Sequence, residues 1–166
     1  MEDIRKPHPI VLGEAEDQDL ENNERRLDTL TRALQKAGVG SLKSLKMLEI
    51  GCGDANLLRF LRTKHFNITG VEARPRGSNI ESVVEARVED MPFVDSTFDV
   101  VFSSLVFDLG AYHQDQRAMM QEIARVLKPG GFYVSRGDEI KVRNRQLRVV
   151  VRMNYDIPIK VYRNES

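Results

Sequence analysis

The sequence predicts an α/β fold with a doubly wound, mostly parallel sheet that ends in an antiparallel hairpin. Short apolar stretches alternate with segments of helical spacing, which is typical of parallel strands joined by helices. A Gly-Cys-Gly turn at residues 51–53 joins the first of these strands to a helix. The last section, residues 146–161, changes to two-residue alternation interrupted by a turn-like Asn-Tyr-Asp, which predicts the hairpin.

Composition limits the domain count and the partners. A chain of 166 residues is the size of one domain, and its 25 basic and 25 acidic side chains balance, so no global field attracts nucleic acid or an anionic membrane. The single cysteine, Cys52, cannot form an internal disulfide. The N-terminus MEDIRKPHP lacks the apolar core of a signal peptide, and no apolar run approaches the roughly 20 residues of a membrane span. We therefore expect a cytoplasmic protein without a membrane segment.

The N-terminal section divides into two parts. Residues 1–20 combine Pro7, Pro9 and Gly13 with acidic side chains and little periodicity, which predicts an irregular arm. From Asn22 or Asn23 a helical stripe begins, formed by Leu27, Leu30, Leu34 and Ala37 and ended by Gly38 or Gly40. We expect residues 21–166 to form a single domain, with this helix packed on the sheet.

Five parallel strands and their helices follow. The predicted strands cover residues 46–50, 67–71, 83–88, 98–103 and 132–135, and the predicted helices cover residues 55–64 and 114–127. Between the second and third strands, residues 74–78 leave room for about one helical turn, so the crossover helix is reduced. Residues 146–153 and 157–161 are the two strands of the predicted hairpin.

The turn at residues 51–53 predicts a ligand site. A glycine turn lets the backbone approach a ligand and directs N–H groups of the helix start at a negative group. A dinucleotide-binding turn would carry a third glycine where this chain has Asn56, so binding of NAD by a dehydrogenase is a poor alternative. Glu72 ends the second strand, about 20 residues after the turn, where a carboxylate can accept both ribose hydroxyls.

Four segments, in order, resemble the class I S-adenosylmethionine-dependent methyltransferases, especially the small-molecule group called type 11. They are Glu-Ile-Gly-Cys-Gly at 49–53, Gly-Val-Glu at 70–72, Val-Glu-Asp-Met-Pro-Phe-Val-Asp-Ser-Thr-Phe-Asp-Val-Val at 88–101 and Arg-Val-Leu-Lys-Pro-Gly-Gly-Phe at 125–132. The resemblance covers roughly residues 44–134. It implies a Rossmann-like methyltransferase sheet, S-adenosylmethionine as the cofactor and S-adenosylhomocysteine as the product.

The resemblance also implies roles for individual residues. Glu49 would contact the ammonium group of the cofactor, the glycine turn would contact its methionine part, and Glu72 would bind the ribose. The segment after the third strand would border the adenine, and the end of the fourth strand would face the transferred methyl group. The implied cofactor-binding residues are Glu49, Gly51, Cys52, Gly53, Glu72, Val88, Glu89, Ser103 and Leu105. Cys52 also reads as a small packing residue within the turn. No metal is expected.

The chain departs from the family pattern at several positions. Ala55 stands where many relatives have glycine, and Asp108 where relatives often have histidine. Arg87 replaces an aspartate that accepts from the adenine amino group, and arginine can only donate. Arg87 could stack on adenine, or pair with Glu85 or Glu89 and leave adenine to backbone groups.

Methyl transfer needs in-line placement of the acceptor and, for an oxygen or nitrogen acceptor, removal of a proton. The catalytic candidates, all after the fourth strand, are Asp108, Tyr112 and His113, although a loop histidine is commonly a surface residue. We expect a small-molecule acceptor of unidentified chemistry. The alternative is a catalytically inactive, methyltransferase-like binding or regulatory subunit.

The expected partners follow from charge and size. Basic side chains between residues 136 and 152 lack interleaved aromatics, so nucleic acid is not an expected partner. The chain is short for a dedicated substrate cap. A homodimer or a partner protein could therefore complete the substrate pocket.

Overall fold

The computed structural model describes residues 12–75, 81–107 and 115–166, with side chains from residue 19 onward. The strands are β1 (Lys46–Ile50), β2 (Asn67–Glu72), β3 (Val83–Glu85), β4 (Phe98–Ser104), β5 (Leu127–Arg136), β6 (Leu147–Met153) and β7 (Ile159–Asn164). The helices are α1 (Leu12–Lys36), α2 (Asn56–Thr63) and α3 (Gln116–Val126). These bounds match the predicted elements closely, except at α1, at the shorter β3 and at the junction of α3 with β5.

The strands form one sheet in the order β3-β2-β1-β4-β5-β7-β6. β1 to β5 pair in parallel, whereas β7 pairs antiparallel with both β5 and β6. The predicted fold class is confirmed, including the terminal hairpin. The second strand of the hairpin, β7, lies beside β5, so β6 forms the edge of the sheet. Among the described residues between β2 and β3, none is helical.

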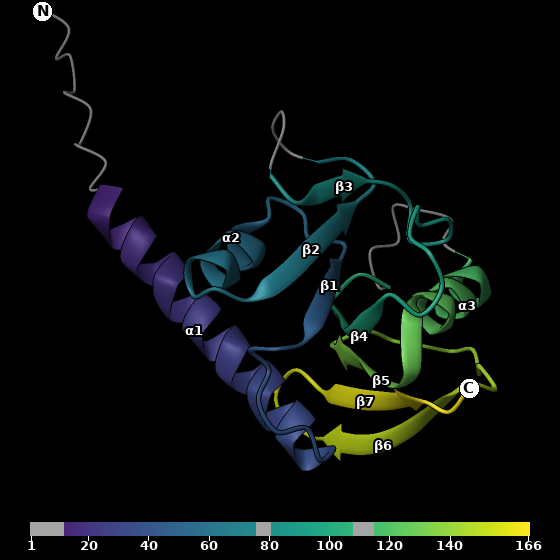
Figure 1. Ribbon diagram of the computed structural model, residues 1–166. Coiled ribbons are helices and arrows are strands. Elements are labelled where there is room, and N and C mark those ends of the chain that lie inside the picture. The colour runs from purple at the N-terminus through teal and green to yellow at the C-terminus, as the bar shows by residue number, and fades with distance from the viewer. Residues whose placement is uncertain (1–11, 76–80, 108–114) are drawn as a thin grey trace, which may run out of the picture.

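Helix α1 begins earlier than the sequence suggested. It starts at Leu12, so residues 12–20 of the predicted irregular arm are helical, while residues 1–11 lie outside the described part. Figure 1 shows these first turns extending beyond the body of the molecule, and Leu20 is 48% exposed. Their sequence carries no regular apolar stripe that would have predicted them. Their sequence, LGEAEDQDL, nevertheless favours a helix start, with acids near the positive end of the helix dipole.

The two faces of the sheet carry separate cores. Figure 1 shows α1 and α2 on one side of the sheet and α3 on the other. Leu34 and Leu58 pack against Val100 on the first side, whereas Ile123 packs on the second side with Val101. Neighbouring residues of β4 therefore face opposite cores, as the two-residue period of a strand requires.

A side chain from a distant strand caps the junction of α3 with β5. α3 ends at Val126 and β5 begins at Leu127, so the predicted loop over residues 128–131 belongs to the strand. The side-chain amide of Asn164, on β7, donates to the carbonyls of Ala124, Leu127 and Lys128 at 3.1–3.2 Å. These bonds satisfy the Ala124 carbonyl in the last turn of α3 and two carbonyls at the start of β5.

Arg125 connects two of the segments that resemble the methyltransferase family, residues 88–101 and residues 125–132. Its guanidinium donates to the carbonyl of Phe93 at 2.6 Å, to the carbonyl of Met91 at 2.9 Å and to the Glu122 carboxylate at 2.7 Å. Glu122 in turn accepts from the Met91 amide at 3.0 Å. The segment after residue 90 is thereby fastened to α3.

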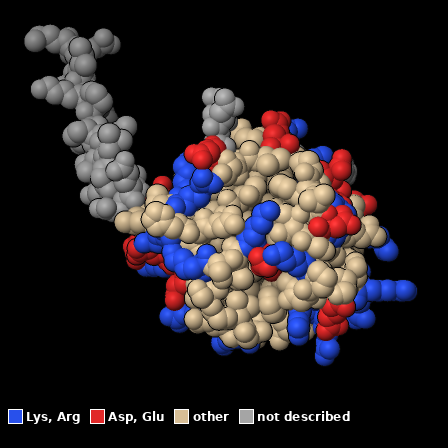
Figure 2. All heavy atoms as spheres, viewed as in Figure 1, with Lys and Arg blue, Asp and Glu red and all other residues tan. Residues whose placement is uncertain are grey.

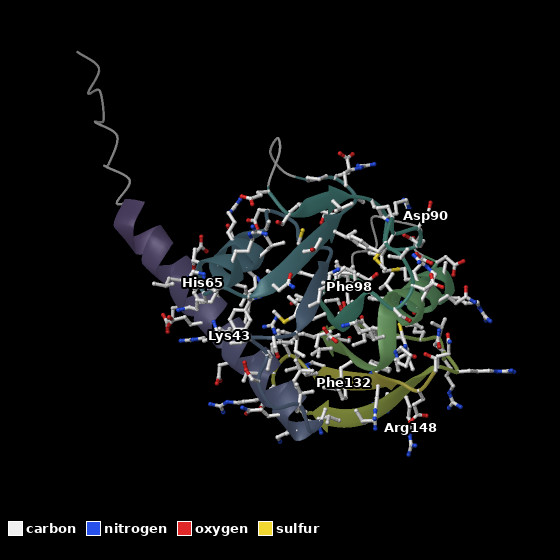
Figure 3. All side chains as sticks on the ribbon, in the orientation of Figure 1. Lys43, His65, Asp90, Phe98, Phe132 and Arg148 are labelled. Atoms are coloured by element: carbon white, nitrogen blue, oxygen red, sulfur yellow. The ribbon has the colours of Figure 1, made fainter. Side chains whose placement is uncertain are left out.

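Replacing Arg125 with methionine is expected to lower the free energy of unfolding by about 2–3 kcal/mol, because two carbonyls and Glu122 lose a charged donor. Urea denaturation followed by circular dichroism measures this loss. The matched control is Arg148→Met, on an arginine that lies on β6, is 73% exposed and makes one long ion pair (Figure 3). That control should change stability by no more than about 0.5 kcal/mol. Equal losses in the two variants would contradict the fastening role.

Candidate functional site

A cavity of about 610 Å³ lies at the carboxyl ends of β1 to β4. This is the edge where open α/β sheets bind ligands, at the point where β1 is flanked by β2 on one side and β4 on the other. Six of the nine predicted cofactor residues line it: Gly51, Gly53, Glu72, Val88, Glu89 and Leu105. Asp54, Arg74, Ser104 and Val106 also line it, although the sequence analysis did not select them.

The two glycines of the turn serve different purposes. Both have left-handed φ angles, +64° at Gly51 and +57° at Gly53. A Cβ atom at Gly51 would lie 2.5 Å from a methyl carbon of Val106, so glycine is needed there for packing. A Cβ at Gly53 would meet no protein atom within 4 Å, so this glycine leaves open space in the cavity wall. The turn therefore provides a backbone surface that a ligand can approach closely.

Glu72 ties the end of β2 to the glycine turn. Its Oε2 accepts from the Gly53 amide at 2.9 Å, and its Oε1 accepts from the Arg74 amide at 3.1 Å. These two bonds fix the carboxylate at the cavity wall. Each oxygen keeps further acceptor capacity, which is what ribose hydroxyls would need.

Glu49 is buried on the α1 side of the sheet. It is 4% exposed, and its Oε1 accepts from the Arg26 guanidinium at 3.3 Å. Its Oε2 is buried without a hydrogen-bond partner among the described groups. Burial raises the pKa of Glu49 to about 7, against the opposing effect of Arg26. An ammonium group is the kind of ligand that would compensate this carboxylate, so Glu49 fits the cofactor that the sequence predicts.

The other three predicted cofactor residues, Glu49, Cys52 and Ser103, lie outside the wall of the large cavity. Cys52 is 7% exposed, and burial, with the neighbouring Glu49 and Glu72, raises the pKa of its thiol to about 12, so the thiol stays protonated. Ser103 is 2% exposed and is hydrogen-bonded to the Tyr133 hydroxyl at 2.7 Å. The neighbouring Ser104 lines the cavity in its place.

A buried carboxylate that the sequence analysis missed holds the loop after β4. Asp138 is 6% exposed, and its Oδ1 accepts from the amides of Val106 at 2.6 Å and Phe107 at 3.1 Å. Its Oδ2 accepts from the hydroxyls of Ser135, at 3.1 Å, and Ser103. Desolvation raises the pKa of Asp138, while these four hydrogen bonds oppose the rise. Its place just after the fifth strand was the one available sequence signal.

Arg87 forms an ion pair within the cavity wall. Its guanidinium lies 2.9 Å from the Glu89 carboxylate, so of the two acidic partners considered, the structure pairs it with Glu89. Arg87 is 54% exposed at its side chain, whereas Glu89 is 17% exposed. The three catalytic candidates Asp108, Tyr112 and His113 lie outside the described residues.

Surface charges on the visible face, and possible metal ligands among the described residues, are dispersed rather than clustered. Figure 2 shows basic and acidic side chains interspersed on the visible face. Over the described ranges, no three His, Cys, Asp or Glu side chains are grouped to hold a metal ion. A search of the same residues for a helix both long and apolar enough to cross a membrane finds none.

The sheet order defines a Rossmann-like α/β protein, and the glycine-turn cavity at the carboxyl edge of its sheet is a candidate ligand site. A family model described as a methyltransferase domain matches residues 48–135, which include the glycine turn, Glu72 and the loop before β4. The chain belongs to this methyltransferase family.

Curated relatives share part of the chain. Sterol 4-C-methyltransferase strm-1 of Caenorhabditis elegans is 31% identical over 105 residues, covering 55% of this chain and 30% of that protein. The 2-methyl-6-phytyl-1,4-hydroquinone methyltransferase of Synechocystis is 29% identical over 121 residues, covering 66% of this chain and 37% of that protein. The chain thus spans about a third of the length of these relatives.

Solved structures share the fold. A chain from the complex between the Haloferax volcanii Trm112 methyltransferase activator and a methyltransferase superposes with a TM-score of 0.61 at 18% identity, covering 92% of this chain and 96% of that one. The PH0226 protein of Pyrococcus horikoshii gives a TM-score of 0.61 at 18% identity, covering 86% and 91% of the two chains. At this identity the likeness concerns the fold alone.

Proposed function

We propose that this domain binds S-adenosylmethionine in the 610 Å³ cavity and transfers its methyl group to a small-molecule acceptor. The observation that carries the proposal is the Glu72 carboxylate, fixed to the Gly53 amide in the cavity wall. A carboxylate held beside an open glycine turn would suit a ribose, and the turn itself carries no basic residue for a phosphate. Family membership supports the same cofactor.

The chain's residues would hold the cofactor from several sides. Gly51 and Gly53 would border its methionine part, the unpaired oxygen of Glu49 would compensate its ammonium, and Glu72 would accept from its ribose. Val88 and Glu89 would border the adenine. With Arg87 paired to Glu89, backbone groups would take over the role of the absent adenine acceptor.

When bound, S-adenosylmethionine supplies a methyl group on a positively charged sulfur, which leaves with the bonding electrons as S-adenosylhomocysteine while an acceptor lone pair forms the new bond. The protein's own tasks are to orient the acceptor and remove its proton. Leu105, which lines the cavity after β4, would border the methyl end. Asp108, Tyr112 and His113 follow it in the sequence and remain the candidates for proton removal.

A small organic acceptor is supported by the names of relatives, which include a sterol, a hydroquinone and a fatty-acid methyltransferase. A partner protein that completes the pocket is supported by the activator in the Haloferax complex. Both are proposals for this chain. A folded protein that binds neither form of the cofactor would instead favour the inactive, partner-binding alternative.

Replacing Glu72 with alanine is expected to weaken S-adenosylhomocysteine binding at least about tenfold, because the ribose and the Gly53 amide both lose their acceptor. Isothermal titration calorimetry measures the affinity. Glu81→Ala is the matched control, because Glu81 is 86% exposed and pairs only with Arg62 among the described cations. An unchanged affinity in Glu72→Ala would remove the ribose assignment. No heat and no thermal shift with the unmodified protein at millimolar ligand would end the cofactor proposal.

A further inference from the structure

A second cavity, of about 570 Å³, lies beside the first. Its walls come from α1, from the start of α2 and from the ends of β4 and β5. Asp54 and Ser104 line both cavities. Unlike the first cavity, this one is lined almost entirely by polar and charged side chains. Its position suggests a second ligand next to the cofactor.

Two arginines from different elements face this second cavity. Arg26 comes from α1 and Arg136 is the last residue of β5. Arg136 donates to the Ser104 hydroxyl at 2.9 Å. Both arginines are partly buried and line the same cavity. Desolvation and the positive charge of Arg26 lower the pKa of Arg136.

The other charges around the cavity leave Arg136 uncompensated. Arg26 has Glu49 as a partner at 3.3 Å, and the exposed Arg25 pairs with Glu21. Asp54 accepts from the side chain of Asn56 at 3.0 Å, and Asp19 lies on the rim at α1. Arg136 takes part in no ion pair with any residue that the structure describes.

The neutral side chains of the cavity complete the chemistry. Asn22, Asn23, Thr29 and Ser104 offer amide and hydroxyl groups around the two cations. The planar fork of a guanidinium matches the two oxygens of a carboxylate or phosphate. An anion between the arginines would relieve their mutual repulsion and replace the water lost on burial.

We propose that the second cavity is the acceptor site and that the acceptor carries an oxyanion, a carboxylate or a phosphate, bound between Arg26 and Arg136. The inference rests on the proposed function, because the shared wall at Asp54 and Ser104 is what places this cavity beside the cofactor. The anionic group anchors one end of the acceptor. The rest of the acceptor extends toward Ser104, where the two cavities meet.

The test uses inorganic phosphate and benzoate as separate probes, with sodium chloride at matched ionic strength as the reference. Arginine Nε–Hε signals are followed by nuclear magnetic resonance on the full chain and assigned with the single variants. Signals of Arg26 and Arg136 are expected to move with an apparent Kd of about 1–10 mM for at least one probe. The preferred probe tells phosphate from carboxylate. Signals that move equally with chloride would overturn the anion site.

Arg136→Met is expected to weaken probe binding at least about tenfold, and Arg136→Lys, which keeps the charge without the fork, by less. Arg148→Met, on the exposed edge strand, should leave it unchanged. In Arg136→Met the affinity for S-adenosylhomocysteine should stay within about twofold of the unmodified protein. A tenfold loss there would assign Arg136 to the cofactor and overturn the inference. If the protein binds a probe but not S-adenosylhomocysteine, both the cofactor assignment and the acceptor assignment are overturned. If it binds S-adenosylhomocysteine but neither probe, only the acceptor assignment is overturned.

Discussion

Replacing Asp138 with alanine is expected to lower the free energy of unfolding by about 3–5 kcal/mol, the largest effect of any single change considered for this chain. The substitution leaves the amides of Val106 and Phe107 and the hydroxyls of Ser103 and Ser135 without their shared acceptor. Asp138 is 6% exposed, so water cannot readily take its place. The loop after β4 should loosen before the rest of the domain.

Two variants make the Asp138 test specific. Asp138→Asn keeps one oxygen for the two amides and presents its amide to hydroxyls that can turn to accept, so the expected loss is about 1–2 kcal/mol. Ser135→Ala removes one of the four bonds and should cost about 1 kcal/mol. Urea denaturation followed by circular dichroism ranks the three. If the Asp138→Ala variant were as stable as the Ser135→Ala variant, the four hydrogen bonds to Asp138 would not be what holds the loop after β4.

The second large effect concerns Glu49 and pH. The pKa of Glu49 is about 7 in the folded protein against 4.5 ordinarily, so the folded state keeps a proton that the unfolded chain has released between these values. Stability contributed by this group is therefore lost as the pH rises from 4.5 through 7. Glutamine stays neutral throughout. At pH 8 the Glu49→Gln variant is expected to be more stable than the unmodified protein by about 2–3 kcal/mol, with the difference vanishing near pH 4.5.

Urea unfolding of both proteins across this pH range measures the difference, and Glu81→Gln, on an exposed side chain, is the control. Parallel stability curves would contradict a raised pKa for the buried Glu49 carboxyl, whose Oε2 has no hydrogen-bond partner among the described groups. Ligand addition gives an independent reading. S-adenosylhomocysteine carries an ammonium, so it should stabilise the unmodified protein more than the Glu49→Gln variant at pH 8, because only the carboxylate gains a charge partner.

Local sequence patterns were sufficient to predict most strands of the sheet and the glycine turn. Residues 46–50 have the predicted bounds of β1, and Glu72 ends β2 at the cavity, as its place in the sequence indicated. These features depend on strand periodicity and on the conformational freedom of glycine, which act over a few residues. The positive φ angles at Gly51 and Gly53 follow from the same local rule.

Other features could not be predicted because they depend on which face of a helix or strand is packed against the rest of the protein. Ser103 and Ser104 are neighbours on β4 and therefore point to opposite faces of the sheet. Ser103 is hydrogen-bonded to Asp138, whereas Ser104 lines both cavities. The first turns of α1 were missed because their sequence shows no regular apolar stripe, and they extend beyond the body of the molecule (Figure 1). In both cases the deciding fact is packing, which a local pattern does not contain.

By itself, the sequence determined the doubly wound sheet, the glycine turn and the position of Glu72 at the end of β2, because backbone geometry and strand period fix them locally. Only the tertiary structure decided that β7 separates β5 from β6, that Asp138 holds the loop after β4, and that Arg26 and Arg136 meet across a cavity. Arg26 and Arg136 are far apart in the chain. They line one cavity only because α1 packs on the same side of the sheet to which β4 and β5 bring their ends.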